Sequence, residues 1–391
     1  MKVLLLTDAD VFAGTERHIF DLACALHQND SRDSDSRDAN SAASSVMEVR
    51  VACPVPSPLA ARCQQAQLRV LDVPKRGFID WNAVRILRRE LKSRRAEVIH
   101  AHNGRTALAA ALAVFLARRG SLVTTQHFLA PNRTTQSGIK AKISDAAHRW
   151  VAKQTHAVIA ISQSVRDASL SRGESSGKIT VVPNGIPDVA HDEHRVLDIS
   201  QDESQTLEIG DQIFILCAAR LEKEKDIATL INAMKIVAQD EPSALCLVAG
   251  EGALRDDLQA HIDKLSLQNN VRLLGFRDDV LSLMRACDVF VLPSLAEPFG
   301  LVLIEAMAFG KPVVATRAGG PLEIVAEGES GFLVAPSSGE ELADALLKLL
   351  RDQTLRETMG AASRMRYERQ FTASRMAREI AAVYARAMEE V

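Results

Sequence analysis

The six cysteines of this 391-residue chain include no C-x-x-C pair. Most of them stand inside apolar runs, as small core residues do; they are Cys24, Cys53, Cys63, Cys217, Cys246 and Cys287. Cysteine ligands of structural zinc sites are usually paired at close spacing. The spacing therefore gives no support for a cysteine-zinc site, and unpaired cysteines of this kind are typical of a reducing cytoplasm.

Long hydrophobic runs are also missing from the start of the chain. The sequence opens with MKVLLLTD, where Asp8 closes an apolar stretch of only a few residues. A membrane-spanning helix needs about 20 apolar residues, and a signal peptide needs a longer apolar segment than this one. We therefore expect a cytoplasmic protein, either free or peripheral on the inner face of the cytoplasmic membrane.

A third absence concerns cofactors. No G-x-G-x-x-G motif follows the first apolar run, where the sequence reads AGTE at residues 13–16. That glycine pattern carries the pyrophosphate in dinucleotide-binding folds. A dinucleotide-dependent oxidoreductase is therefore disfavoured.

Short apolar runs alternate with helix-length segments through both halves of the chain. Hydrophobic residues make up 47% and charged residues 25%, which are ordinary globular values, and 391 residues exceed what one core usually holds. Continuous apolar strands separated by helices favour parallel sheets covered on both faces. The strands are expected at 3–6, 49–53, 98–100, 122–125, 158–161, 179–182, 214–218, 245–249, 271–274, 289–292 and 313–315. The sequence thus predicts an α/β fold with two doubly wound domains.

Composition predicts the domain boundaries. A polar stretch follows the PNGIPD segment, and a second one, rich in Ser, Asp and Arg, occupies residues 29–45. We expect the latter to be a disordered insert, either a tolerated insertion or a docking element. The expected organisation is an N-terminal domain at 1–185, a linker at 186–210, a C-terminal domain at 211–365, and C-terminal helices at 366–391 that cross back to the N-terminal domain.

Charge is divided unevenly between the halves. Residues 1–185 hold 26 Lys and Arg against 16 Asp and Glu, a net charge of +10, whereas residues 186–391 carry −13. One basic cluster lies in 85–95, and a second consists of Lys140, Lys142, Arg149 and Lys153 around Trp150. A basic amphipathic helix with a tryptophan suits an anionic membrane surface or a phosphorylated acceptor. A solvated helix packed on its own sheet is the alternative.

The segment 288–325 carries the strongest functional signal. An apolar strand ends at Pro293, Glu297 follows in a loop, and a helical pattern starts after Gly300 with Glu305 inside it. The first turn of a helix presents unpaired N–H groups and the positive end of its dipole. This strand-loop-helix arrangement therefore predicts a site for an anion such as a phosphate.

These residues resemble a known family. Glu297 and Glu305, within EPFGLVLIE, match the E-x7-E motif of retaining glycosyltransferases of family 4, also described as glycosyl transferases group 1, which have the GT-B fold. Further matching segments occur in the same order, namely AGTE, HAH at 100–102, VVPNGI at 181–186, ARLEKEK at 219–225 and GEG at 250–252. The resemblance covers nearly the whole chain and implies two Rossmann-like domains that face each other across a cleft.

The resemblance implies four catalytic residues. Arg220 and Lys225 would stabilise the diphosphate of a nucleotide-sugar donor as it leaves, Glu297 would bind hydroxyls of the donor sugar, and His102 would contact that sugar. Without the resemblance, Arg220 and Lys225 are better explained as part of a solvated charge run, in which Glu222 and Glu224 alternate with Lys223 and Lys225. His100 is expected in the core on the opposite face of its strand.

A second group of residues is expected to bind the donor. Glu305 would hold the ribose hydroxyls, and backbone amides would bind the phosphates and sugar; the group comprises Gly14, Glu305, Phe299, Gly300, Leu301, Val302, Gly250 and Glu251. Further candidates are His127, Gly319, Gly320 and Glu323, the last being either a ligand or a complement to a helix dipole.

No metal or other cofactor is expected. Asp8-Ala9-Asp10 has the form of the D-x-D metal motif of the other glycosyltransferase fold, but its position does not suit this one. The expected donor is a nucleoside diphosphate sugar. A UDP-sugar is the preferred candidate, and a GDP-sugar or an ADP-sugar is the alternative. The expected reaction is hexosyl transfer to a glycan or lipid-linked acceptor of the cell envelope, such as a lipopolysaccharide precursor. A non-catalytic module that binds nucleotide sugars or polyanions is the alternative, and no nucleic-acid partner is expected.

Overall fold

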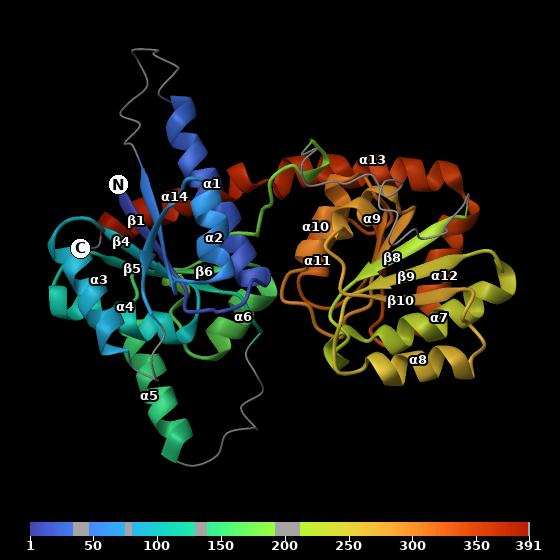
Figure 1. Cartoon of the computed structure of the whole chain (residues 1–391), viewed down its shortest axis with the longest axis horizontal. Helices are drawn as coiled ribbons and strands as arrows, with labels where there is room; N and C mark the ends of the chain where they lie inside the picture. Colours follow the sequence, from blue (N-terminus) through green and yellow to red (C-terminus); the bar gives the residue numbers. More distant parts are fainter. Residues whose placement is uncertain (34–46, 75–79, 130–138, 192–211, 390–391) are drawn as a thin grey trace. The chain divides into compact units, whose positions relative to one another are not determined.

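A computed structural model describes residues 1–33, 47–74, 80–129, 139–191 and 212–389 (Figure 1). Most of the expected insert at 29–45 and most of the expected linker at 186–210 lie outside these residues. The described chain divides into two compact units. The first contains Met1–Pro187 together with Ala373–Val391, and the second contains Asp188–Thr372.

The first unit is built on a parallel seven-stranded sheet of order β3-β2-β1-β4-β5-β6-β7. Its strands are β1 (Lys2–Leu6), β2 (Glu48–Cys53), β3 (Arg69–Asp72), β4 (Val98–Ala101), β5 (Ser121–Gln126), β6 (Ala157–Ala160) and β7 (Ile179–Val181). The central strands β1, β4, β5 and β6 are buried on both faces over most of their length, as is typical of parallel sheets.

Helices cover both faces of this sheet. They are α1 (Gly14–Asp33), α2 (Pro58–Gln65), α3 (Trp81–Lys92), α4 (Gly104–Ala117), α5 (Ile139–Gln154), α6 (Gln163–Ser171) and α14 (Ala373–Glu389). Val3 and Leu5 of β1 pack in one core with α1, α2 and α14, whereas Leu4 and Leu6 pack in another with α3 and α4. This division follows from the alternation of side chains along a strand.

The last helix of the chain is therefore part of the first unit. Helix α14 packs against α1, β5 and β6. The Ser121 hydroxyl donates to the Ala387 carbonyl over 2.8 Å, and the Tyr384 hydroxyl lies 2.7 Å from Nδ1 of His100. Segments more than 250 residues apart in sequence thus complete one core.

The second unit has a parallel six-stranded sheet of order β10-β9-β8-β11-β12-β13. Its strands are β8 (Phe214–Ala218), β9 (Leu245–Ala249), β10 (Val271–Gly275), β11 (Val289–Leu292), β12 (Val313–Thr316) and β13 (Gly331–Val334). Its helices are α7 (Ile227–Asp240), α8 (Arg255–Lys264), α9 (Val280–Ala286), α10 (Leu301–Ala308), α11 (Pro321–Ile324), α12 (Gly339–Arg351) and α13 (Gln353–Gln370).

The two sheets confirm the predicted α/β class, and each expected apolar run overlaps a strand. Strands β3 and β13 were not expected. Both lie at sheet edges; β3 has only two apolar residues between Arg69 and Asp72 and is half exposed, whereas the short apolar run of β13 after Gly331 was missed.

The strand order creates a topological switch point in each unit. In the second sheet the chain runs outward from β8 through β9 to β10 and then returns to place β11 on the other side of β8. In the first sheet the same reversal separates β1 from β4. Ligands of open α/β sheets bind at the carboxyl ends of strands beside such points.

Candidate active site

Glu297 and Lys225 meet at the switch point of the second unit. Glu297 follows β11, and Lys225 lies in the 3-10 turn Lys223–Lys225 that follows β8. The Lys225 ammonium lies 2.6 Å from Oε2 of Glu297, and their side chains are only 16% and 11% exposed. The Ser294 hydroxyl donates to the same oxygen over 3.3 Å. The carboxylate is therefore held in one orientation by two donors.

A glycine pair fixes the backbone of the Glu297 loop. The amide of Gly320 donates to the Glu297 carbonyl over 2.7 Å. A Cβ on Gly319 would lie 2.2 Å from that carbonyl oxygen, and a Cβ on Gly320 would lie 2.2 Å from the oxygen of Phe299. Gly319 also has a φ of +74°. These glycines, expected as a second turn near the nucleotide, thus permit close packing of two loops.

The GEG and ARL motifs pack against each other by backbone contact. The amide of Leu221 donates to the Glu251 carbonyl over 2.9 Å. Gly250 has a φ of +148°, and a Cβ there would lie 1.9 Å from the Ala219 oxygen. The turns that follow β8 and β9 can approach this closely only because Gly250 has no side chain.

The two cations expected at the phosphate differ in their surroundings. Arg220 forms a surface ion pair with Glu224 at 2.7 Å, and its side chain is 69% exposed. Glu251 is likewise exposed and pairs with Arg255 at 2.9 Å. Lys225 is largely buried with Glu297. An exposed pair exchanges partners readily, so Arg220 is available to an incoming anion at low cost.

The N-terminus of α10 has the geometry expected of an anion site. Gly300 precedes the helix with a φ of +110°, and Leu301 and Val302 form its first turn, half-buried. The Phe299 side chain is 3% exposed and packs against Phe371, so this residue can offer only its backbone to a ligand. Glu305 is 9% exposed on the same helix.

Glu323 lies in the short helix that follows the Gly319–Gly320 turn. It is half-buried in the short helix α11, and its backbone carbonyl accepts from Arg366 over 2.8 Å. Its place in the first turn of α11 leaves both expected roles, ligand and complement to a helix dipole, as predictions.

The first unit contains a cavity of about 780 Å³ at the carboxyl ends of β4 and β5. It is lined by residues that include Asp8, Asn103, Arg105, His102 and His127. The Asn103 amide donates to Asp8 over 2.7 Å, and Arg105 pairs with the other Asp8 oxygen at 3.0 Å. Both carboxylate oxygens of Asp8, the first residue of the D-x-D sequence, therefore contact side chains of this unit.

Gly14, expected to bind the donor through its backbone, is exposed at the start of α1.

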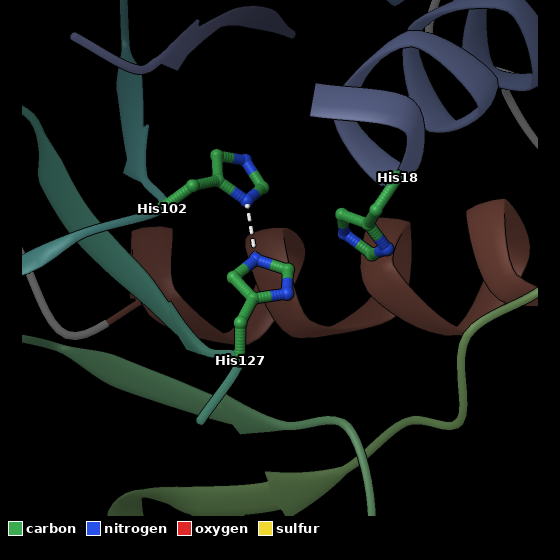
Figure 2. A group of neighbouring side chains, drawn as sticks. All are labelled: His18, His102 and His127. Carbon is green, nitrogen blue, oxygen red and sulfur yellow. Dashed lines mark hydrogen bonds between the residues drawn. The ribbon is translucent and has the colours of Figure 1, made fainter. Parts of the chain in front are cut away.

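Three histidines converge beside this cavity (Figure 2). His102 follows β4, His127 follows β5, and His18 reaches them from α1. Nδ1 of His102 lies 3.1 Å from Nε2 of His127. The ring of His18 lies 4.9 Å from that of His127 and 5.5 Å from that of His102, centroid to centroid.

His100 corrects one expectation. It is fully buried in the core as predicted, with Nε2 2.6 Å from the Thr125 hydroxyl. Its ring, however, lies 4.1 Å from that of His102, so both side chains are on the same face of the sheet. The prediction of opposite faces is wrong because residues two apart on a strand share a face.

Burial keeps these imidazoles neutral. It lowers the pKa of His18 to about 4, and the Asn184 side chain opposes this shift. Burial likewise lowers the pKa of His102 and of His127 well below the usual range, and neighbouring histidines add to the effect. A charged imidazolium would be costly to desolvate here.

His18 was missed by the sequence reasoning. It lies on the apolar face of α1 beside Ile19 and Leu22, and all three are buried. A polar residue on such a face was the one available signal. Its proximity to His102 and His127 depends on how α1 packs on the sheet, which periodicity alone does not specify.

Comparison with known proteins identifies the class. Residues 198–366 match the model of "Glycosyl transferases group 1", and residues 39–189 match that of "Glycosyltransferase Family 4". The chain therefore belongs to the group 1, family 4 glycosyltransferases, and it has their two-domain GT-B fold.

Individual relatives agree with that assignment. The chain is 31% identical to glycogen synthase of Mycobacterium tuberculosis over 299 residues. The aligned region covers 75% of this chain and 69% of the relative. It is 25% identical over 287 residues to an Escherichia coli UDP-Gal:alpha-D-GlcNAc-diphosphoundecaprenol alpha-1,3-galactosyltransferase, covering 71% and 72%. Among solved structures, Anabaena HepE in complex with UDP superimposes with a TM-score of 0.80 at 25% identity, over 98% and 100% of the two chains.

Within the described residues, every helix is too short or too polar to cross a bilayer.

Proposed function

We propose that this glycosyltransferase moves a hexosyl group from UDP-sugar to an acceptor in cell-envelope glycan assembly, with retention of anomeric configuration. The observation that carries the proposal is the Lys225–Glu297 pair, which holds a cation and a carboxylate together at the switch point of the second sheet. Support for the donor comes from the likeness to HepE, whose structure contains UDP. Support for the acceptor class comes from the E. coli relative, which is named for transfer to alpha-D-GlcNAc-diphosphoundecaprenol.

The charges of the second unit suit a departing diphosphate. As the bond between the sugar C1 and the phosphate oxygen breaks, its electron pair leaves with the nucleoside diphosphate. Arg220, Lys225 and the amides at the start of α10 would stabilise that growing negative charge. Glu297 would orient the sugar through its hydroxyls, and Glu305 would hold the ribose.

Retention without a covalent intermediate requires attack on the same face that the leaving group vacates. The acceptor oxygen then forms the new bond to C1 as the oxocarbenium-like state collapses. Its proton passes to an oxygen of the departing phosphate, so no separate protein base is needed. The roles expected for Gly14 and His102 toward the donor stay predictions.

Nucleotide binding and turnover in EDTA test the proposal. We expect UDP to raise the melting temperature more than GDP or ADP at equal concentration, since a ligand at a hundred times its Kd stabilises by about 2.7 kcal/mol. We expect UDP-sugar hydrolysis or transfer to persist in excess EDTA, because cations and helix amides neutralise the diphosphate. Turnover that disappears in EDTA and returns with Mg²⁺ or Mn²⁺ would contradict metal independence. Binding of UDP without turnover of any donor would favour the non-catalytic alternative.

A further inference from the structure

The His18, His102 and His127 cluster has unused ligating atoms. Within the described residues, both ring nitrogens of His18 and Nε2 of His102 are buried without a hydrogen-bond partner. Unsatisfied buried nitrogens are uncommon in folded proteins, and each one calls for an explanation. The unpartnered nitrogens of His18, beside the close contact between His102 and His127, point to a group that is bound there.

We propose that His18, His102 and His127 form a binding site for one imidazole-preferring transition metal ion of the Zn²⁺ type. One ligating nitrogen from each of the three residues can be chosen so that all lie within 4.8 Å of one another. Three histidines and one open position are a recurring ligand set for zinc.

The shortest separation in the cluster already suits a shared metal. Two nitrogens at 2.0–2.1 Å from a tetrahedral ion are about 3.3–3.4 Å apart. Nδ1 of His102 and Nε2 of His127 are 3.1 Å apart, so an ion could replace the proton that they share. His18 would have to move its nitrogen closer by up to about 1.4 Å, a shift within reach of a rotation about its side-chain torsions.

Rigid supports hold two of the three rings. His102 and His127 follow the neighbouring parallel strands β4 and β5, both buried in the centre of the sheet. Beneath them, His100 bonds to Thr125 and to Tyr384 of α14, which passes behind the cluster in Figure 2. Preorganised ligands lose little freedom on binding a metal, which favours affinity.

Access and selectivity also agree with this assignment. His102 and His127 line the 780 Å³ cavity, which gives an ion and its fourth ligand a route to the cluster. Mg²⁺ and Mn²⁺ prefer oxygen ligands, whereas Zn²⁺, Co²⁺, Ni²⁺ and Cu²⁺ accept imidazole. The proposed site is therefore distinct from a metal that would neutralise the donor diphosphate.

Metal binding can be measured without any glycosyl transfer, so its failure is separate from a failure of the proposed function. Tag-free protein is stripped with chelator and titrated with Co²⁺, followed by visible absorption, and with Zn²⁺, followed by calorimetry. We expect one ion per chain, a tetrahedral-type Co²⁺ spectrum, and no heat from Mg²⁺.

Variants of two histidines on the same helix provide the comparison. His18→Ala removes a proposed ligand, whereas His27→Ala removes an exposed histidine of α1. We expect His18→Ala to weaken Zn²⁺ binding by about a hundredfold or more, since even loss of an outer-shell partner costs 10- to 100-fold. His27→Ala should bind as the wild type does.

Circular dichroism and melting curves establish that each variant is folded, and His18→Gln serves as a second, volume-conserving variant. The proposal is overturned if stripped wild-type protein takes up neither Co²⁺ nor Zn²⁺ at one ion per chain. It is also overturned if folded His18→Ala or His18→Gln binds as tightly as His27→Ala.

Discussion

The ammonium of Lys225 and the carboxylate of Glu297 are 2.6 Å apart although 72 residues separate them in the chain. The pair joins the segments that follow β8 and β11, the two strands that flank the switch point of the second sheet. The backbone adds a second link, because the Leu295 amide donates to the Glu224 carbonyl over 2.9 Å. The cation and the carboxylate that we propose to act on the donor are thereby positioned by the same contact.

Lys225→Ala and Arg220→Ala should have similar kinetic effects and different effects on stability. Each should reduce kcat/KM by about a hundredfold, as loss of one preorganised charge at a leaving group does. Lys225→Ala leaves Glu297 largely buried without its cation, so it should also destabilise the fold by about 3 kcal/mol. Arg220→Ala removes an exposed pair and should cost at most about 1 kcal/mol.

Steady-state kinetics and urea denaturation monitor these two quantities. Near wild-type turnover in both variants would reject the phosphate assignment. Equal shifts of the urea midpoint would show that the buried pair contributes no more to stability than the surface pair.

The two glutamates of the E-x7-E motif should separate in their kinetic effects. Glu305→Ala should mainly raise the donor KM, because the ribose is bound equally in the ground and transition states. Glu297→Ala should lower kcat as well, because Glu297 is proposed to bind the reacting sugar. Initial rates over a range of donor concentrations distinguish them, and the same change in both variants would remove this division of roles.

Gly319→Ala and Gly328→Ala form a matched pair, since their φ angles are +74° and +75°. At Gly319 a Cβ would lie 2.2 Å from the Glu297 oxygen, whereas at Gly328 nothing lies within 4 Å. Gly328→Ala should therefore cost only the backbone strain, about 1–2 kcal/mol. Gly319→Ala should cost more and should also impair donor binding by displacing the Glu297 loop.

Thermal melting and donor titration of the two alanine variants check this expectation. If Gly319→Ala bound the donor normally and had the same melting temperature as Gly328→Ala, the close approach of the two loops would not matter for the site.

Acidification should destabilise the first unit through its buried histidines. Below pH 6.5 the unfolded chain binds protons at these residues, while the folded chain does not, because the folded pKa of His18 is about 4. The stabilisation that depends on these histidines being neutral should be fully present above pH 6.5. The free energy of unfolding should then fall by about 1.4 kcal/mol per pH unit for each such histidine as the pH decreases toward 4.

Urea unfolding of the wild type and of His18→Gln between pH 7 and pH 5 tests this. The variant should show a shallower dependence by about one proton, whereas His27→Gln, which alters an exposed residue, should retain the wild-type slope. A slope unchanged in His18→Gln would contradict a neutral buried His18.

The basic surface of the first unit should bind anionic vesicles. Arg149 and Lys153 are exposed on α5, and Trp150 packs edge to face on Phe115, which is 56% exposed. The Lys140 and Lys142 side chains lie outside the described residues. Each basic residue near an anionic surface contributes about 1 kcal/mol to binding. Reversing the charges of Lys140, Lys142, Arg149 and Lys153 together should therefore abolish attachment to the vesicles. High salt should weaken the attachment of the wild type, because it screens these charges.

Co-sedimentation with anionic and with neutral vesicles at low and high salt is the measurement. Binding that persists after the fourfold reversal would move the contact to the exposed arginines of 85–95. No binding at low salt would favour the solvated-helix alternative and a soluble acceptor.

Much of the second unit's site was readable from the sequence. Strand, loop and helix at 288–325 are local patterns, so the positions of Glu297, Gly300 and Glu305 along their elements followed from periodicity and the glycine. The different environments of Arg220 and Lys225 did not follow. In sequence both belong to one alternating charge run, and only long-range packing places Lys225, and not Arg220, against a carboxylate that follows another strand.

The sequence by itself determined the class of fold, the positions of most strands and the family, because these depend on short-range patterns of apolar residues, glycines and charges. Tertiary structure alone decided which distant residues meet. The histidine cluster draws His18 from α1, His102 from beyond β4 and His127 from beyond β5, with α14 behind them. Such a meeting depends on strand order and helix packing, which arise from burial of whole faces and leave no periodic signal at the single residues that they bring together.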